Sequence, residues 1–284
     1  MDEVFQGAVR VLEKERVCDE TVRIRLEPLS GEMPAPRPGQ FGMLAVKAPE
    51  WPAQLQRPFS FSSPGEMVVR VAYHQDCGCP ERLAGRASSY IVNRLEPGEL
   101  ALLSCPLGRG FLDFEPDDMY YLIGGGCGMP PLYFLARELR KGGDGAGFLA
   151  MTGARTKSGL LLPQGLDASE LMVATDDGTE GCKGTVVEMM DKYGKFKDGS
   201  TFCICGPKNM LKPAAEAAGR HTSPDKILLD VETYMGCGRG VCNKCGVAGY
   251  NACSDGPVFR YSDIKDSDFF DYEALKSGSR RRIG

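Results

Sequence analysis

The chain has 284 residues, a net charge of −4, 42% hydrophobic and 25% charged residues, which is an ordinary composition for a globular protein. This length allows two or three domains, and the slightly acidic balance gives no electrostatic reason to expect nucleic acid. With only two histidines, a histidine-rich metal site is excluded, and no Ser-His-Asp nucleophile motif is present. An enzyme built on this chain would therefore take its chemistry from cofactors.

Membrane insertion and export are not indicated by the sequence. No apolar run reaches the roughly eighteen residues of a membrane span. The acidic start Met1–Val4 lacks the apolar core of a secretion signal. Twelve cysteines without an export signal favour a reducing compartment over a disulfide scaffold, so we expect a cytoplasmic protein with no membrane span.

The first part of the chain, residues 4 to about 115, reads as β-rich. Apolar and polar residues alternate in Thr21–Leu26, as they do in a half-buried strand. Further short strands are predicted at Phe41–Val46, Met67–Tyr73 and Leu100–Leu103. Pro/Gly turns separate them, and Ala84–Leu95 is expected to be a short helix. The pattern predicts a small antiparallel β-barrel over residues 1–116.

The pattern changes at the apolar run Met119–Ile123, which is followed by a glycine-rich turn and a helix from about Leu132 to Arg140. Later strands are predicted at Phe148–Thr152, Leu171–Thr175 and Thr201–Cys205, and helices at Thr185–Lys192 and Pro207–Gly219. Strands that alternate with helices of this length predict a doubly wound parallel sheet, here over residues 117–224.

Two turns in this second part are candidate nucleotide contacts. The turn Gly124–Pro131 presents backbone N–H groups and a helix start, which suit a phosphate, although its spacing is not Gly-x-Gly-x-x-Gly. A tight turn without a ligand is the alternative. Cys205-Gly206-Pro207 follows a later strand, at the edge of a sheet where ligands collect. Ordinary packing of Cys203 and Cys205 is the alternative there.

The tetrapeptide Arg57–Ser60 is a candidate flavin contact in the β-rich part. The planar fork of Arg57 can bind two pyrophosphate oxygens at once, and Ser60 offers a hydroxyl to a flavin edge. A surface arginine beside a proline turn explains the same residues.

The strongest candidate site is the cysteine set Cys237, Cys242, Cys245 and Cys253. The spacing of four and then two residues between the first three is that of a plant-type [2Fe–2S] loop. Interleaved glycines allow the chain to wrap around such a cluster. A zinc site is the alternative, but zinc sites usually bring two Cys-x-x-Cys pairs and only one is present. We expect a cluster domain over residues 225–284, with a solvated tail from Asp263.

These motifs occur in the order of the ferredoxin–NAD(P) reductase superfamily. Glu232–Cys237 and Cys253–Phe259 flank the cysteines, and residues 4–260 resemble the electron-transfer subunits of class B dihydroorotate dehydrogenase. The resemblance implies FAD, a [2Fe–2S] cluster and NAD(H) as cofactors, with Cys237, Cys242, Cys245 and Cys253 as the metal ligands. It implies FAD contacts from Arg57, Pro58, Phe59, Ser60, Val71, Ala72, Tyr73, Gly85, Ala87 and Ser88. It implies nicotinamide nucleotide contacts from Gly125, Gly126, Gly128, Pro130, Gly206 and Pro207. Ser60 and Cys205 would be the catalytic residues beside the flavin and the nicotinamide.

The chain departs from the family pattern at three places. Gly85–Ser88 replaces the second flavin motif, usually Gly-x-Gly-Thr, and an insert over residues 74–83 carries Cys77 and Cys79. Those two thiols are either redox-active or part of an exposed loop. The spacing to Cys253 is also short. Arg155 and Lys157 could meet a 2′-phosphate, but the resemblance favours NADH.

These cofactors together predict an oxidoreductase subunit for electron transport. Nicotinamide exchanges a hydride and the cluster exchanges single electrons, so a flavin must lie between them. By resemblance the partner in a heteromeric complex is a catalytic flavoprotein subunit that oxidises dihydroorotate, a step of pyrimidine biosynthesis. Alternatives are a reductase subunit of a bifurcating NAD(P)H–ferredoxin transhydrogenase, a sulfite reductase or a hydrogenase, and, from another class, a zinc-stabilised binding module.

Overall fold

The computed structural model describes residues 3–47, 55–71, 73–74, 83–84, 86–113, 117, 119–142, 146–163, 165–167, 169–274 and 280–282. The chain divides into two compact units, which are described separately. The first comprises residues 1–36 and 41–107, and the second comprises residues 37–40 and 108–284. No helix in the described ranges is long and apolar enough to cross a membrane.

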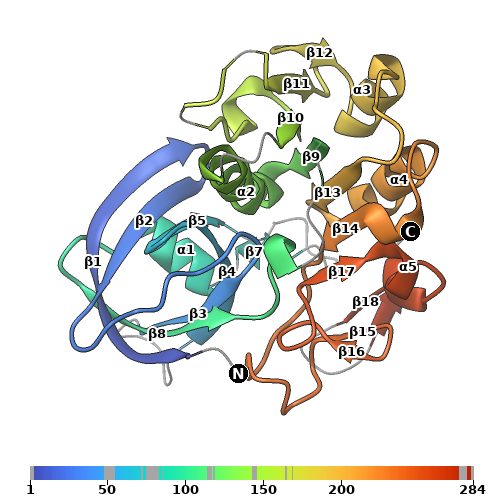
Figure 1. Cartoon of the computed structure of the whole chain (residues 1–284). Coiled ribbons are helices and arrows are strands. Elements are labelled where there is room, and N and C mark those ends of the chain that lie inside the picture. The colour runs from blue at the N-terminus through green and yellow to red at the C-terminus, as the bar shows by residue number, and fades with distance from the viewer. Residues whose placement is uncertain are drawn as a thin grey trace. The chain divides into compact units, whose positions relative to one another are not determined.

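The first unit is a closed antiparallel barrel of six strands in the order β1-β2-β5-β4-β3-β8 (Figure 1). The strands are β1 Phe5–Cys18, β2 Thr21–Pro28, β3 Phe41–Val46, β4 Leu55–Ser63, β5 Glu66–Arg70 and β8 Leu100–Leu107. Alternate side chains fill its interior, among them Ile24, Leu44 and Leu103, each at most 1% exposed. The predicted barrel is therefore confirmed.

A short helix and a hairpin complete this unit. Helix α1 (Arg86–Asn93) packs on β4 and β5, and the hairpin pairs β6 (Tyr73–His74) with β7 (Leu83–Ala84). The predicted strand Met67–Tyr73 was too long, because β5 ends at Arg70. The insert cysteines Cys77 and Cys79 lie outside the described residues.

The second unit is built on a seven-stranded sheet in the order β12-β11-β10-β9-β13-β14-β17. Its strands are β9 Met119–Gly125, β10 Gly147–Ala154, β11 Leu171–Thr175, β12 Cys182–Lys183, β13 Thr201–Cys205, β14 Ile227–Asp230 and β17 Val258–Arg260. All neighbours are parallel except β14 and β17, which pair antiparallel. The predicted fold class, a barrel followed by a doubly wound parallel sheet, is confirmed.

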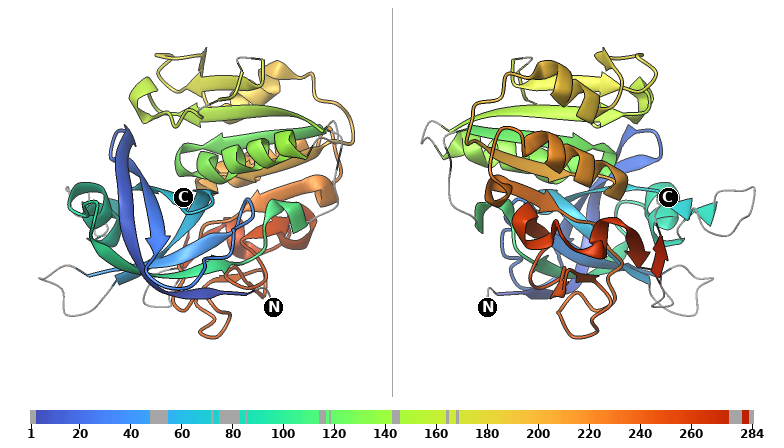
Figure 2. Two further views of the ribbon diagram at one scale, coloured as in Figure 1. Left: turned by 60° about the vertical axis from the view of Figure 1, so that its left-hand side comes forward. Right: turned by 90° about the vertical axis from the view of Figure 1, so that its right-hand side faces the viewer.

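Helices cover both faces of this sheet. Figure 2 shows α2 (Met129–Lys141) over one face, and α3 (Val186–Tyr193) with α4 (Lys208–Ala218) over the other. Helix α3 begins with a reciprocal capping box between Thr185 and Glu188 and ends at Gly194, whose φ is +56°. The helix boundaries therefore follow from local sequence, within a few residues of those predicted.

The cluster segment runs between β14 and β17 and contains the hairpin β15 Gly246–Val247 and β16 Tyr250–Asn251. The chain continues through α5 Tyr261–Ile264, β18 Tyr272–Ala274 and β19 Arg280–Arg282. Single 3-10 turns occur at Phe111–Asp113, Gly126–Gly128, Lys157–Gly159, Pro224–Lys226 and Asp268–Phe270. The expected domain boundaries at 116 and 224 stay predictions, although β14 and β17 extend the sheet beyond 224.

The expectation of a solvated tail from Asp263 is wrong for the residues up to Phe270. Ile264, Phe269 and Phe270 are all less than 9% exposed. The Lys208 ammonium lies 3.8 Å from the Phe269 ring centroid and donates a hydrogen bond to the Tyr272 carbonyl. These contacts hold the segment against α4. Burial of its apolar side chains therefore keeps the segment packed on the protein, although many of its other residues are polar.

Candidate functional site

The strand order in the sheet of the second unit changes direction between β9 and β13. From β9 the chain builds outward through β10, β11 and β12, then returns to place β13 and β14 on the other side of β9. Such a reversal leaves a crevice at the carboxyl ends of the two strands, where open α/β sheets bind ligands. At this edge Cys205 of β13 is paired with Gly124 on one side and Asp230 on the other.

The predicted nicotinamide residues meet at this same edge. A methyl group built on Gly128 would lie 2.1 Å from the Cys205 carbonyl oxygen and 2.6 Å from the Gly206 nitrogen. A methyl group on Gly125 would lie 3.4 Å from Pro207 Cδ. The turns after β9 and β13 therefore touch backbone to backbone at Gly128, where packing alone requires glycine, whereas the contact of Gly125 with Pro207 is at an ordinary van der Waals distance.

Two further residues of the first turn were predicted as contacts. Gly126 has φ of +53°, a conformation that favours glycine, and Pro130 is buried in the first turn of α2. Cys127 is exposed between Gly126 and Gly128. The structure thus gathers all six predicted nucleotide contacts, together with Cys205, on two adjoining turns.

Asp230 is a residue of this edge that the sequence analysis did not single out. Its side chain is 5% exposed and accepts a hydrogen bond from the Cys205 thiol. Burial, and then the nearby charge of Glu232, raises the pKa of Asp230 to about 7. Burial also raises the pKa of the Cys205 thiol well above its ordinary value, and Asp230 adds to this. The sequence feature that could have identified Asp230 is an acidic residue directly after the apolar run Ile227–Leu229.

The turns after β10 and β11 are held together by hydrogen bonds and an ion pair. Lys157 Nζ lies 2.8 Å from a Glu180 carboxylate oxygen, and the Lys157 backbone N–H donates to Thr179 Oγ1. Thr179 in turn donates to Asp177 Oδ1, which lowers the pKa of that carboxyl. The suggested contact of Arg155 and Lys157 with a 2′-phosphate stays a prediction.

The four cluster cysteines lie in two pairs. Cys245 Sγ and Cys253 Sγ are 3.3 Å apart, and the Cys237 thiol interacts with the thiol and the backbone N–H of Cys242. No group of three His, Cys, Asp or Glu side chains gathers around one point in the described ranges. Two pairs are the arrangement that a two-iron cluster needs, since each iron takes two thiolates.

The backbone of the loop points its N–H groups at these sulfurs. Arg239 N lies 3.3 Å from Cys237 Sγ, and Gly240 N lies 3.0 Å from Cys253 Sγ. Gly238 and Gly240 have φ of +71° and +70°, which makes this inward turn possible. Hydrogen bonds of this kind stabilise thiolate sulfur and tune the potential of an iron–sulfur centre. The residues present therefore fit a [2Fe–2S] cluster.

The same contacts govern the thiol pKa values. Burial acts to raise the pKa of Cys237, but N–H donors from Arg239 and Cys242 outweigh it and lower the pKa to about 7. The hydrogen bond between the Cys245 and Cys253 sulfurs lowers the pKa of Cys245 to about 6 and raises that of Cys253. The loop thus favours at Cys237 and Cys245 the anionic sulfur that a metal requires.

The predicted flavin residues lie on one wall of the barrel. Arg57, Pro58, Phe59 and Ser60 are half-buried along β4, and Arg57 Nη1 donates to the Gln56 carbonyl, 2.6 Å away. Val71 is buried just after β5, and Ala87 and Ser88 are buried on α1, which packs on both strands. Tyr73 belongs to β6, while Ala72 and Gly85 lie outside the described residues.

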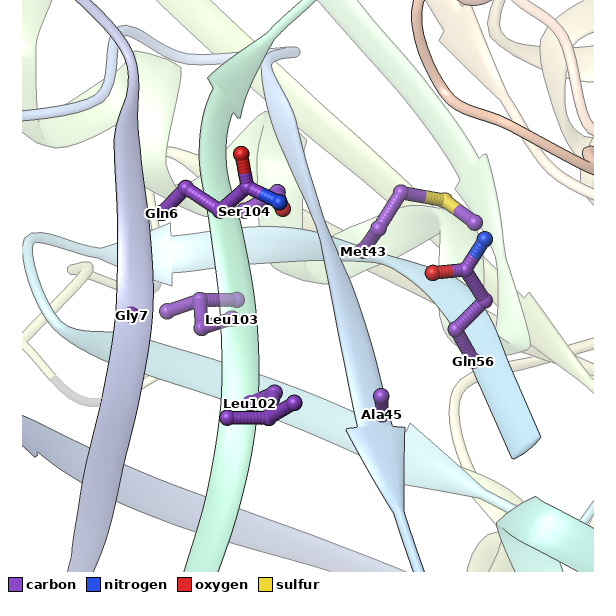
Figure 3. Close-up of a pocket in the computed structure, with 8 residues that line it drawn as sticks. All are labelled: Gln6, Gly7, Met43, Ala45, Gln56, Leu102, Leu103 and Ser104. Carbon is purple, nitrogen blue, oxygen red and sulfur yellow. The ribbon is translucent and has the colours of Figure 1, made fainter. Parts of the chain in front are cut away.

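A hollow in the barrel wall is lined by neighbours of these residues, since Gln56 precedes Arg57 and Met43 pairs with Pro58. Figure 3 shows its eight labelled lining residues, which come from β1, β3, β4 and β8. Met43 and Ala45 contribute apolar surface, and Gln6, Gln56 and Ser104 contribute polar groups. None of the eight is among the predicted flavin contacts, so this hollow is not the predicted FAD site.

Comparisons with known proteins agree with this geometry. Residues 232–265 match the model of the iron-sulfur cluster binding domain of dihydroorotate dehydrogenase B. The chain is 34% identical over 239 residues to the dihydroorotate dehydrogenase B (NAD(+)) electron transfer subunit of Geobacillus kaustophilus, covering 80% of this chain and 86% of the relative. It is 31% identical to a probable subunit of the same name from Pyrococcus horikoshii, covering 85% and 86% of the two chains. The chain belongs to this family of electron-transfer subunits.

Solved structures show the same fold. The chain superposes with a TM-score of 0.70 and 24% identity on a structure described as NADH-dependent reduced ferredoxin-NADP oxidoreductase, covering 93% of this chain and 91% of the other. Phthalate dioxygenase reductase gives a TM-score of 0.57 at 20% identity, over 78% and 66% of the chains. The predicted family and the iron–sulfur domain of this electron-transfer subunit are confirmed, and the individual flavin and nucleotide contacts stay predictions.

Proposed function

We propose that this chain carries electrons between NAD(H) and a separate catalytic subunit that oxidises dihydroorotate, through FAD and a [2Fe–2S] cluster. The observation that carries the proposal is the loop of residues 237–253. It sets four thiols in two pairs under inward N–H groups, within a segment that matches the iron–sulfur domain of this family. Relatives named for NAD(+) support electron flow from the catalytic subunit through the cluster and the flavin to the nicotinamide.

We assign the residues as follows. Cys237 and Cys242 would hold one iron, and Cys245 and Cys253 the other, following the pairs in the structure. Arg57 and Ser60 would bind FAD, with the guanidinium of Arg57 supplying donors to the pyrophosphate. When bound, FAD converts a two-electron hydride exchange into single-electron exchange with the cluster.

The nucleotide would lie at the carboxyl edge of β9 and β13. Gly126, with φ of +53°, gives the turn its tight bend, and the N-terminal end of the α2 dipole favours negative charge beside it. The favourable term is the dipole, because Pro130 and Pro131 carry no N–H and the Met129 N–H is bonded to the Gly126 carbonyl. Cys205 would orient the nicotinamide ring. A buried thiol with a raised pKa stays protonated at neutral pH, so this residue contributes packing and a weak hydrogen bond rather than a nucleophile.

The cluster loop also offers a surface for the partner subunit. Val241, between the first two ligands, is 78% exposed, and the neighbouring Cys242 is exposed as well. An apolar side chain beside an exposed ligand suits a protein interface and brings the cluster close to an acceptor. We propose that the catalytic subunit covers Val241 in a heteromeric complex.

The domain boundaries and the cellular location are also proposals. We propose functional parts at residues 1–116 for FAD, 117–224 for the nucleotide and 225–284 for the cluster, supported by the barrel ending with β8 and the sheet starting with β9. We propose a cytoplasmic location, supported by the ten described cysteines, none of which forms a disulfide within the described ranges.

Purification of the chain with its native partner tests this function. We expect flavin and iron–sulfur absorbance, two irons per chain, and NAD+ reduction with dihydroorotate. Cys242→Ser should remove the cluster absorbance, whereas the control Cys182→Ser, an exposed thiol in β12, should retain it. A colourless, zinc-containing protein would refute the proposal. A coloured complex that contains a ferredoxin-type or hydrogenase subunit and does not oxidise dihydroorotate would favour the alternative reductase.

A further inference from the structure

The Cys205–Asp230 pair contains a buried polar atom that the protein leaves unsatisfied. Both side chains are at least nine-tenths buried, and they end adjacent parallel strands at the ligand-binding edge. Asp230 Oδ2 is buried and has no hydrogen-bond partner among the described residues. A buried carboxyl oxygen without a partner is unfavourable, so its presence at this edge indicates a role toward a ligand.

We propose that Asp230 is a positioning residue that senses the charge of the nicotinamide ring, ionised beside the cationic ring of NAD+ and protonated beside the neutral ring of NADH. This inference rests on the proposed nicotinamide site. The oxidised ring carries a positive charge that the reduced ring lacks. An ionised carboxylate in a poorly solvated edge therefore favours the oxidised nucleotide over the reduced one.

The surroundings of Asp230 allow its carboxyl group to gain or lose a proton near neutral pH. Its pKa is raised to about 7, first by burial, so little free energy separates its two forms there. The other titratable groups that act on the pair in the described ranges are Glu232, which follows β14, and Cys127, in the turn after β9. On the strand that pairs with β14, Asp230 faces the apolar Val258.

Linkage then fixes the direction of the effect. If a cationic ring lowers the pKa of Asp230, NAD+ binding to the protonated form must release a proton to solvent. NAD+ affinity must rise with pH relative to the affinity for a neutral-ring nucleotide. A lowering by one pKa unit gives about a fivefold rise in the affinity ratio between about pH 6 and about pH 8.

The test uses the FAD- and cluster-loaded complex and isothermal titration with two ligands. NAD+ is compared with tetrahydro-NADH, whose neutral ring keeps the carboxamide and phosphates and cannot transfer a hydride. In the wild type we expect the affinity ratio to rise about fivefold over this range, with proton release on NAD+ binding near pH 7. Asp230→Asn should flatten the ratio and abolish the proton release.

Two further variants separate the possible outcomes. Asp225→Asn changes an exposed carboxylate at the opposite end of β14 and should retain the wild-type ratio. Glu232→Gln tests the neighbouring carboxylate. A flat ratio in the wild type, or a pH dependence that survives in Asp230→Asn and disappears in Glu232→Gln, overturns the inference. Failure of either nucleotide to bind the wild type would instead refute the proposed nicotinamide site.

Discussion

Replacement of Gly128 by alanine should disturb the nucleotide edge through a steric clash with the backbone of Cys205 and Gly206. The added methyl group would lie 2.1 Å from the Cys205 carbonyl oxygen, where ordinary contact begins at 3.4 Å. One of the two backbones must therefore move by roughly 1.3 Å, the difference between these distances. Overpacking of this kind costs up to about 3 kcal/mol. Gly128 has φ of −77° and ψ of −15°, so alanine itself adopts the conformation and recovers about 1 kcal/mol.

The net expectation is a loss of about 2 kcal/mol of stability, or roughly 4–8 °C in melting temperature followed by circular dichroism. NAD+ affinity should fall at least about tenfold, because Cys205 and Gly206 are displaced by about an ångström. Gly142→Ala is the matched control at the other end of α2. Its φ is −62° and its nearest contact is 3.6 Å, so it should be neutral or stabilising. A Gly128→Ala protein with unchanged melting and NAD+ binding would refute this steric reasoning.

Three other changes have defined outcomes. In urea titrations, Asp230→Asn should stabilise the nucleotide-free protein by up to about 4 kcal/mol above pH 7 and by little below pH 4. The reason is that the native pKa of Asp230, raised to about 7, makes its ionised form increasingly unfavourable in the folded protein as the pH rises from 4 to 7. A stability difference that does not change with pH would contradict this prediction. Iodoacetamide should alkylate the exposed Cys127 more than about a hundredfold faster than Cys105, whose pKa burial raises to about 12, and equal rates by mass spectrometry would exclude that burial. Thr185→Ala should lower the free energy of unfolding by about 1 kcal/mol through loss of the capping box with Glu188, whereas Thr185→Ser should retain it.

Local sequence predicted the elements whose determinants are local. The predicted strands Phe41–Val46, Leu171–Thr175 and Thr201–Cys205 have the bounds found in the structure. Their apolar content and flanking turns set both ends. The ligand cysteines were identifiable for the same reason, since a cluster loop is recognised by spacing and glycine content within a few residues.

The elements that sequence reasoning missed depend on distant partners. Strand β14 pairs with β17 across the whole cluster segment, and this pairing extends the nucleotide sheet into the expected cluster domain. The tail residues Phe269 and Phe270 are buried, and Phe269 lies against Lys208 of α4. Such pairings are decided by tertiary packing, which local propensity does not report.

Asp230 illustrates why the chemistry of a site can escape a motif search. In sequence it is one acid at the end of an apolar run, and such acids usually lie in solvent. Its properties arise only when β13 and β14 align in parallel and place its carboxyl group beside the Cys205 thiol in a dry edge. Gly128 of the neighbouring turn is explained by backbone contact, but the unsatisfied oxygen of Asp230 is not. A residue that weakens the fold at neutral pH and lies where the ligand must bind is more informative about function than one that packing alone requires.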